Sequence, residues 1–114
     1  MTQEDDMDFA NYQFRSKQTA VYPQDKALEY LALGLVSEAG EVAGKVKKLI
    51  RDHGSQLTDE QSEMLQAEIG DVLWYISELC TTLKVNMATV ARNNIEKLTK
   101  RKESNTIHGS GDNR

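Results

Sequence analysis

The chain has 114 residues, of which 39% are hydrophobic and 28% charged, with a net charge of −4 and one cysteine. This length fits a single domain of ordinary globular composition. The longest apolar stretches are far shorter than the roughly 20 residues of a membrane-spanning helix, and a lone cysteine excludes an internal disulfide and a zinc cluster. Met1–Asp8 carries acids and no base, the wrong sign for a secretory or mitochondrial leader, so we expect a cytoplasmic protein without a membrane partner.

The residue pattern predicts helices throughout, because good helix formers dominate and the alternation typical of strands is nearly absent. A first helix is expected from about Asp8 to Val21, since the residue before Pro23 disfavours the helical conformation. A second is expected from about Asp25 to Asp52, ending at a glycine cap, Gly54.

Thr58 and Gln61 form a capping box that predicts the start of a third helix. Asn86 is placed to cap a fourth helix that ends near Lys102. We therefore predict an all-α antiparallel bundle of about four helices, with one domain over residues 1–102 and a flexible polar tail over residues 103–114. Since so short a chain buries a modest core, part of its stability is expected from homo-oligomer contacts.

Two pairs of acids have helical i, i+3 spacing: Glu38 with Glu41, and Glu68 with Asp71. Each pair flanks the apolar stripe of its helix at a similar angle. If the second and third helices pack antiparallel, the two pairs lie at nearly the same height and converge on one side of the bundle. Either pair alone is more typical of a solvated helix face, and only the two matching pairs together favour a site.

Gathered carboxylates repel one another, and a divalent cation removes that repulsion. Oxygen ligands favour Mg²⁺, or Mn²⁺ as a substitute, over zinc, and Mg²⁺ in such sites commonly binds phosphates as well. The expected substrate is therefore a polyphosphate.

Acids outnumber bases from Glu38 to Glu78, and bases outnumber acids from Lys84 to Lys102. This pattern favours gathered carboxylates with cations from elsewhere over a nucleic-acid-binding face. Candidate counter-charges are Lys45, Lys48, Lys97 and Arg101, although Lys45 and Lys48 also have the spacing of helical partners of Glu41.

The residues from Leu33 to Val42, with Ser-Glu-Ala-Gly-Glu at their centre, and the later Glu-Ile-Gly-Asp-Val-Leu from Glu68 to Leu73 resemble the MazG family of all-α nucleoside triphosphate pyrophosphohydrolases. Asn94-Ile95-Glu96-Lys97-Leu98 is similar to the Asn-x-x-Lys-Leu element of that family. The resemblance covers roughly residues 30–102.

The resemblance implies roles at matching positions. It implies hydrolysis between the α- and β-phosphates of a (d)NTP in a nucleotide-pool cleansing role, with Glu38 or Glu41 taking the proton of water. The implied Mg²⁺ ligands are Glu38, Glu41, Glu68 and Asp71. The implied phosphate contacts are Asn94, Lys97 and Tyr75, with Lys45 and Arg101 as further candidates.

Family members of this size act as homodimers or as tetramers built from dimers. Trp74 points away from the apolar stripe of its helix, so in a monomer it is expected to be exposed, which suits a subunit interface or a nucleobase stack. A covering by the first helix or the N-terminal arm is the alternative, and Tyr22 is placed to border the same pocket. Competing functions are a dUTPase-like or phosphoribosyl-ATP pyrophosphohydrolase, and a non-catalytic helical interaction module.

Overall fold

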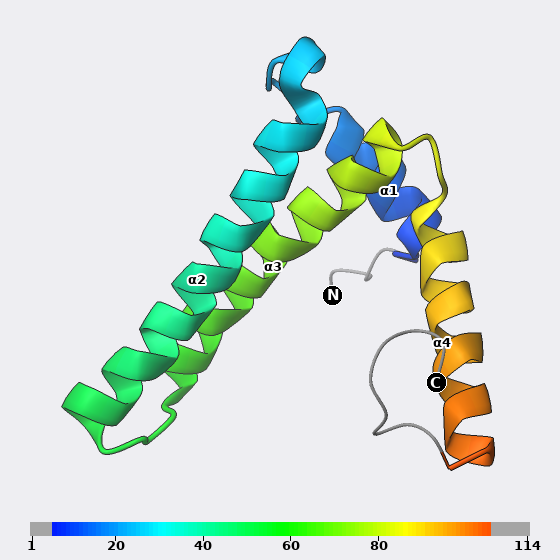
Figure 1. Cartoon of the computed structure of the whole chain (residues 1–114). Coiled ribbons are helices and arrows are strands. Elements are labelled where there is room, and N and C mark those ends of the chain that lie inside the picture. Colours follow the sequence, from blue (N-terminus) through cyan, green and yellow to red (C-terminus); the bar gives the residue numbers. More distant parts are fainter. Residues whose placement is uncertain (1–5, 106–114) are drawn as a thin grey trace.

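The computed structural model describes residues 6–105, and within this range it contains helices and no strand. Figure 1 shows the four α-helices that were predicted. A short 3-10 turn, η1, precedes the second of them, where the sequence suggested the start of the α-helix itself. The elements in chain order are α1 (Phe9–Lys17), η1 (Gln24–Lys26), α2 (Ala27–His53), α3 (Asp59–Thr82) and α4 (Met87–Glu103). The part of the predicted tail from residue 106 onward lies outside the described residues.

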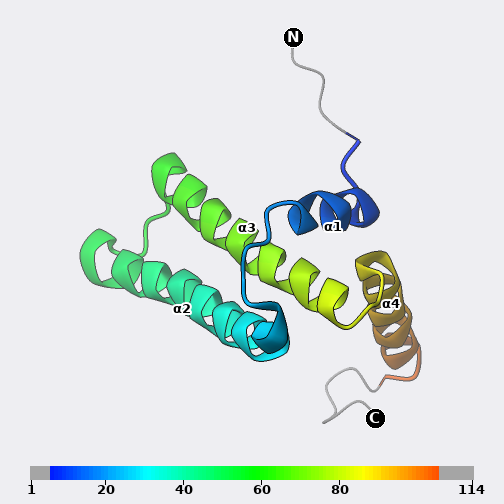
Figure 2. The ribbon, with the colours of Figure 1, turned by 90° about the horizontal axis from the view of Figure 1, so that it is seen from above.

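The two longest helices, α2 and α3, form an antiparallel hairpin and lie side by side in both views (Figures 1 and 2). Helix α2 ends at Gly54, whose φ of 57° is a left-handed conformation that glycine adopts without steric cost. Helix α3 begins with the predicted capping box: the Gln61 amide donates to Thr58 Oγ1 (3.2 Å), and the Thr58 amide donates to Gln61 Oε1 (3.0 Å). These two local signals determine where the loop begins and ends, and because the loop is short, α2 and α3 pack as neighbours.

Helix α1 is shorter than predicted, because residues 18–23 leave the helix and run as a connector towards α2. Two side chains of this connector, Thr19 and Tyr22, hydrogen-bond to α3, which a continued helix would not allow. Helix α1 packs across the C-terminal half of α3. Helix α4 contacts α1 and α3, and among the described residues it makes no contact with α2. A single chain therefore does not close the four helices into one bundle.

Few apolar side chains are buried within the described residues. Those that are fully covered are Ala27, Leu31, Cys80 and Met87. Cys80, the single cysteine of the chain, is therefore part of the core. On α2, by contrast, Leu33, Val36 and Ile50 are 72%, 71% and 64% exposed. None of the described helices combines the length and the apolar composition that crossing a bilayer requires.

Candidate functional site

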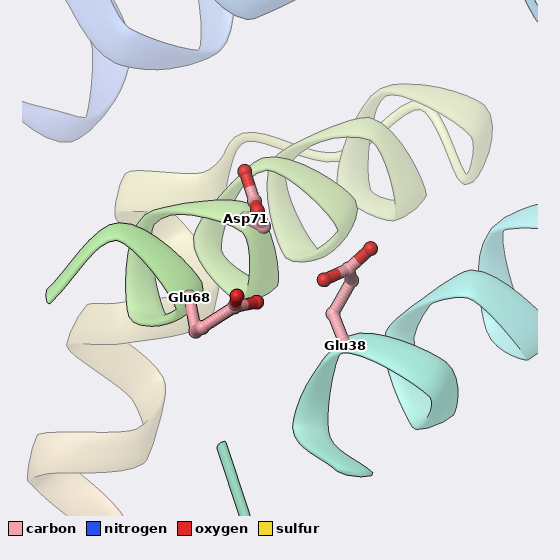
Figure 3. Close-up of side chains that lie close together, drawn as sticks. All are labelled: Glu38, Glu68 and Asp71. Atoms are coloured by element: carbon pink, nitrogen blue, oxygen red, sulfur yellow. The ribbon is translucent and has the colours of Figure 1, made fainter. Parts of the chain in front are cut away.

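The middle of the α2–α3 hairpin brings three of the predicted acids together. Figure 3 shows Glu38 of α2 pointing towards Glu68 and Asp71 of α3. One carboxylate oxygen from each residue lies within 4.8 Å of the others. We call these three residues the acidic cluster. Helical spacing puts Glu68 and Asp71 on one face of α3, and the antiparallel packing puts Glu38 opposite them.

The charges of the acidic cluster act strongly on Glu38. Partial burial, followed by the negative charges of Asp71, Glu68 and Glu41, raises the pKa of the Glu38 carboxyl above its ordinary value. A nearby cation offsets part of this charge, because Lys45 Nζ lies 3.7 Å from Glu68 Oε1. Lys45 therefore borders the cluster, as a phosphate contact would have to.

Glu41, the fourth predicted ligand, does not belong to the cluster. Its side chain is exposed on α2, one helical turn beyond Glu38. Its charge nevertheless contributes to the raised pKa of Glu38, so it lies close enough to act on that carboxyl group. Its role as a metal ligand stays a prediction.

Aromatic side chains adjoin the acidic cluster. Glu38, Asp71, Trp74 and Tyr75 line one open hollow of about 330 Å³. The rings of Trp74 and Tyr75 meet edge to face, with centroids 5.0 Å apart and planes at 85°. Burial, and then the charges of Tyr30, Glu38 and Asp71, raise the pKa of the Tyr75 hydroxyl above its ordinary value.

The Tyr75 ring occupies space that a glycine leaves open on α2. A Cβ atom at Gly34 would overlap the Tyr75 ring. Gly34 lies one helical turn before Glu38, so the absence of a side chain there lets the ring approach the α2 backbone beside the acidic cluster.

The expectation that Trp74 is exposed in a single chain is corrected by the structure. Trp74 is half-buried, since the connector of residues 18–23 covers it. Its indole N–H donates to Thr19 Oγ1 (2.7 Å), and Tyr22 meets its ring edge to face with centroids 6.1 Å apart. Trp74 is thus covered by residues of its own chain, as in the alternative given above, although these residues follow helix α1. Tyr22 lies beside the hollow through its contact with Trp74.

The predicted phosphate contacts on α4 lie elsewhere in the single chain. Asn94 is exposed, Lys97 half-buried and Arg101 buried. Helix α4, which carries them, diverges from the α2–α3 hairpin (Figure 1), and among the described residues it makes no contact with α2. Their roles stay predictions.

Two neighbouring polar residues that the sequence analysis did not single out, Ser77 and Glu78, are fully buried. Glu78 is 0% exposed, with Ser77 at 0% and Ser16 at 6% beside it. The available signal was its position two turns after Asp71 on the same face of α3, within an otherwise apolar stretch.

Comparison with known proteins decides the family. The MazG nucleotide pyrophosphohydrolase domain matches residues 26–106. The chain belongs to the MazG family. It is also 46% identical over 109 residues to the gene 37 protein of Mycobacterium phage L5, a match that covers 90% of this chain and 96% of that protein. No solved structure matches the chain significantly.

The acidic cluster of this MazG chain fits a hard divalent cation. Mg²⁺ binds oxygens at about 2.1 Å, so ligands on opposite sides of the ion are about 4.2 Å apart. One carboxylate oxygen from each of the three residues lies within 4.8 Å of the others, so these three oxygens reach such distances with small side-chain movements. The donor set contains oxygen alone, which disfavours zinc.

Proposed function

We propose that the protein is a Mg²⁺-dependent nucleoside triphosphate pyrophosphohydrolase, which converts a (d)NTP to a (d)NMP and pyrophosphate and so cleanses the nucleotide pool. The observation that carries this proposal is the convergence of Glu38, Glu68 and Asp71 in a chain of the MazG family. The raised pKa of Glu38 supports it, because a site whose charges repel one another favours a bound cation.

The proposed reaction is an attack of water on the α-phosphorus. A new oxygen–phosphorus bond forms, the bond from the α-phosphorus to the bridging oxygen breaks, and pyrophosphate leaves. Glu38, Glu68 and Asp71 would hold the metal, which supplies positive charge against the phosphates and lowers the pKa of water. Glu41 or Glu38 would take the proton of the water. Glu41 suits this role, since its charge acts on Glu38 while its side chain is not part of the cluster.

The surrounding side chains support separate positions along the hollow for the phosphates and the base of the substrate. Lys45, beside Glu68, and Tyr75, beside Glu38 and Asp71, are proposed to contact phosphates. Trp74 and Tyr22 are proposed to contact the base through their rings. The α4 residues Asn94, Lys97 and Arg101 would contact phosphates only where a second copy presents its α4 to this hairpin.

We further propose that the protein is a homo-oligomer, either a dimer or a tetramer built from two dimers. The support is the exposed apolar side of α2, which carries Leu33, Val36 and Ile50. Val36 follows Leu33 by about one helical turn and Ile50 follows Val36 by about four turns, so the three side chains lie on the same side of the helix. Exposed apolar faces of this kind mark protein–protein contacts. A second copy laid against α2 would cover them.

Product analysis on a panel of ribo- and deoxynucleoside triphosphates tests the proposed function. With Mg²⁺ we expect equal amounts of nucleoside monophosphate and pyrophosphate, and with EDTA no product. Glu68→Gln should lower kcat at least 100-fold with unchanged helicity, whereas Glu63→Gln, the same change at an exposed position of α3, should leave it unchanged. Release of orthophosphate, or full activity of Glu68→Gln, would contradict the assignment.

A further inference from the structure

The buried carboxyl group of Glu78 has no part in the reaction proposed above. Glu78 follows Asp71 by two helical turns, about 10.5 Å along the same face of α3. Asp71 is exposed at the hollow, whereas Glu78 is 0% exposed, because α1 and the connector of residues 18–23 cover it. A carboxylate removed from water is costly unless its oxygens are hydrogen-bonded, so the groups that satisfy it are held firmly in place.

Each oxygen of Glu78 accepts a hydrogen bond from a different segment. Ser16 Oγ of α1 donates to Oε2 (2.7 Å), and the Tyr22 hydroxyl of the connector donates to Oε1 (2.8 Å). Ser77 Oγ lies 2.7 Å from Ser16 Oγ and extends the network on the α3 side. Hydroxyl groups bonded to a carboxylate are held more strongly than those bonded to neutral acceptors. Glu78 therefore joins α1 and the connector to α3.

Tyr22 connects Glu78 to the aromatic side chains beside the hollow. Its ring stacks on Tyr30 of α2, with centroids 6.0 Å apart and planes at 17°, and it meets Trp74 edge to face at 87°. Trp74 lines the hollow with Glu38 and Asp71. Since the Trp74 indole N–H also donates to Thr19 Oγ1, the connector is attached to α3 at two points, one at Trp74 and one at Glu78.

We propose that Glu78 is a positioning residue for substrate binding: through the Tyr22 hydroxyl it holds the connector against Trp74 and so fixes the aromatic wall beside the acidic cluster. This inference rests on the proposed function, in which that wall receives the base of a nucleoside triphosphate. An apolar residue at position 78 would fill the same space, but it would not orient a hydroxyl group. A wall fixed before binding loses less conformational entropy when the substrate arrives, so its effect is on KM.

The substitution Glu78→Gln tests the anchor, because glutamine keeps the size of the side chain but offers a single acceptor oxygen. We expect KM for the best triphosphate of the panel to rise about 3- to 10-fold with kcat within about twofold. Trp74 is the single tryptophan of the chain, so its fluorescence reports on the wall without any turnover. Its emission should shift to longer wavelength, and acrylamide should quench it more strongly.

Three further measurements make the outcome decisive. Glu63→Gln, the matched exposed change on α3, should alter neither KM nor Trp74 emission. Tyr22→Phe removes the hydroxyl while keeping the ring, and should reproduce the effects of Glu78→Gln if that variant fails to fold. The KM of the double variant should be no higher than that of Glu78→Gln alone, since both substitutions act on the same hydrogen bond between Tyr22 and Glu78.

Two results would overturn the inference: Trp74 emission and KM unchanged in Tyr22→Phe, or a fall in kcat with KM unchanged in both variants. Absence of turnover in the wild-type protein would instead overturn the proposed function. In that case the fluorescence of Trp74 in the two variants still decides whether Glu78 fixes the wall.

Discussion

Glu38 faces the carboxyl groups of Asp71 and Glu68, and partial burial together with the charges of Asp71, Glu68 and Glu41 raises its pKa in the folded chain. The stabilisation linked to this shift is fully present below the ordinary pKa of about 4.5 and is lost as the pH rises through the raised value. At neutral pH without metal, ionised Glu38 therefore disfavours folding.

Neutralising this side chain should stabilise the metal-free protein. In EDTA at pH 7 we expect Glu38→Gln to raise Tm by about 1–3 °C, since like charges at helical contacts cost a few tenths of a kcal/mol. The difference from wild type should shrink as the pH falls below the ordinary pKa of about 4.5, because Glu38 then becomes protonated in the unfolded as well as in the folded state. Millimolar Mg²⁺ should raise the Tm of wild type and have little effect on Glu38→Gln.

Thermal unfolding followed by circular dichroism at several pH values measures all of these differences. Glu63→Gln, an exposed position on α3, is the control and should match wild type. A Tm of Glu38→Gln equal to that of wild type at every pH would show that the carboxylates do not repel one another in the free protein.

At the scale of the helices, the approach of α2 to α3 beside the site depends on Gly34 and Tyr75. A Cβ atom at Gly34 would overlap the Tyr75 ring, whereas nothing lies within 4 Å of one at Gly44. The two glycines belong to the same helix, so they separate the steric effect of a methyl group from its effect on helix propensity.

We expect Gly34→Ala to lower the free energy of unfolding by about 1–3 kcal/mol, the usual cost of overpacking. Gly44→Ala should raise it by about 0.5–1 kcal/mol, because alanine favours the helix. Urea unfolding measures both values. Equal stability of Gly34→Ala and Gly44→Ala would mean that the Tyr75 ring does not rest against α2.

For the whole molecule, the exposed side of α2 predicts association. Leu33 and Val36 are more than two-thirds exposed on one face of the hairpin. A charged residue at the centre of an apolar interface is buried without a partner, which disfavours assembly strongly. We therefore expect the wild-type protein to sediment as a dimer or tetramer and Val36→Glu to shift it to smaller species at micromolar concentration.

Sedimentation velocity over a range of protein concentrations measures this shift. Leu57→Glu is a suitable control, because Leu57 is exposed in the loop between α2 and α3, at the far end of the hairpin from Leu33 and Val36. Retention of the wild-type assembly by Val36→Glu would place the contact on another surface.

The sequence alone determined those features of the fold that depend on residues close together in the chain. The cap at Gly54 and the capping box of Thr58 and Gln61 are local signals, and the structure has both of them. Helical periodicity likewise placed Glu68 and Asp71 on one face of α3, because residues three apart share a face whatever the tertiary structure.

The tertiary structure decided what depends on residues far apart in the chain. Tyr22 and Glu78 are 56 residues apart, and Thr19 and Trp74 are 55 residues apart. No local sequence pattern predicts hydrogen bonds between residues so far apart. Only the packing of α1 and the connector on α3 makes Glu78 buried and covers Trp74. In the same way, the rotation of α2 against α3 decided that Glu38 enters the acidic cluster and Glu41 stays outside it. Helix spacing fixes angles within one helix, whereas contacts between helices depend on how their side chains pack.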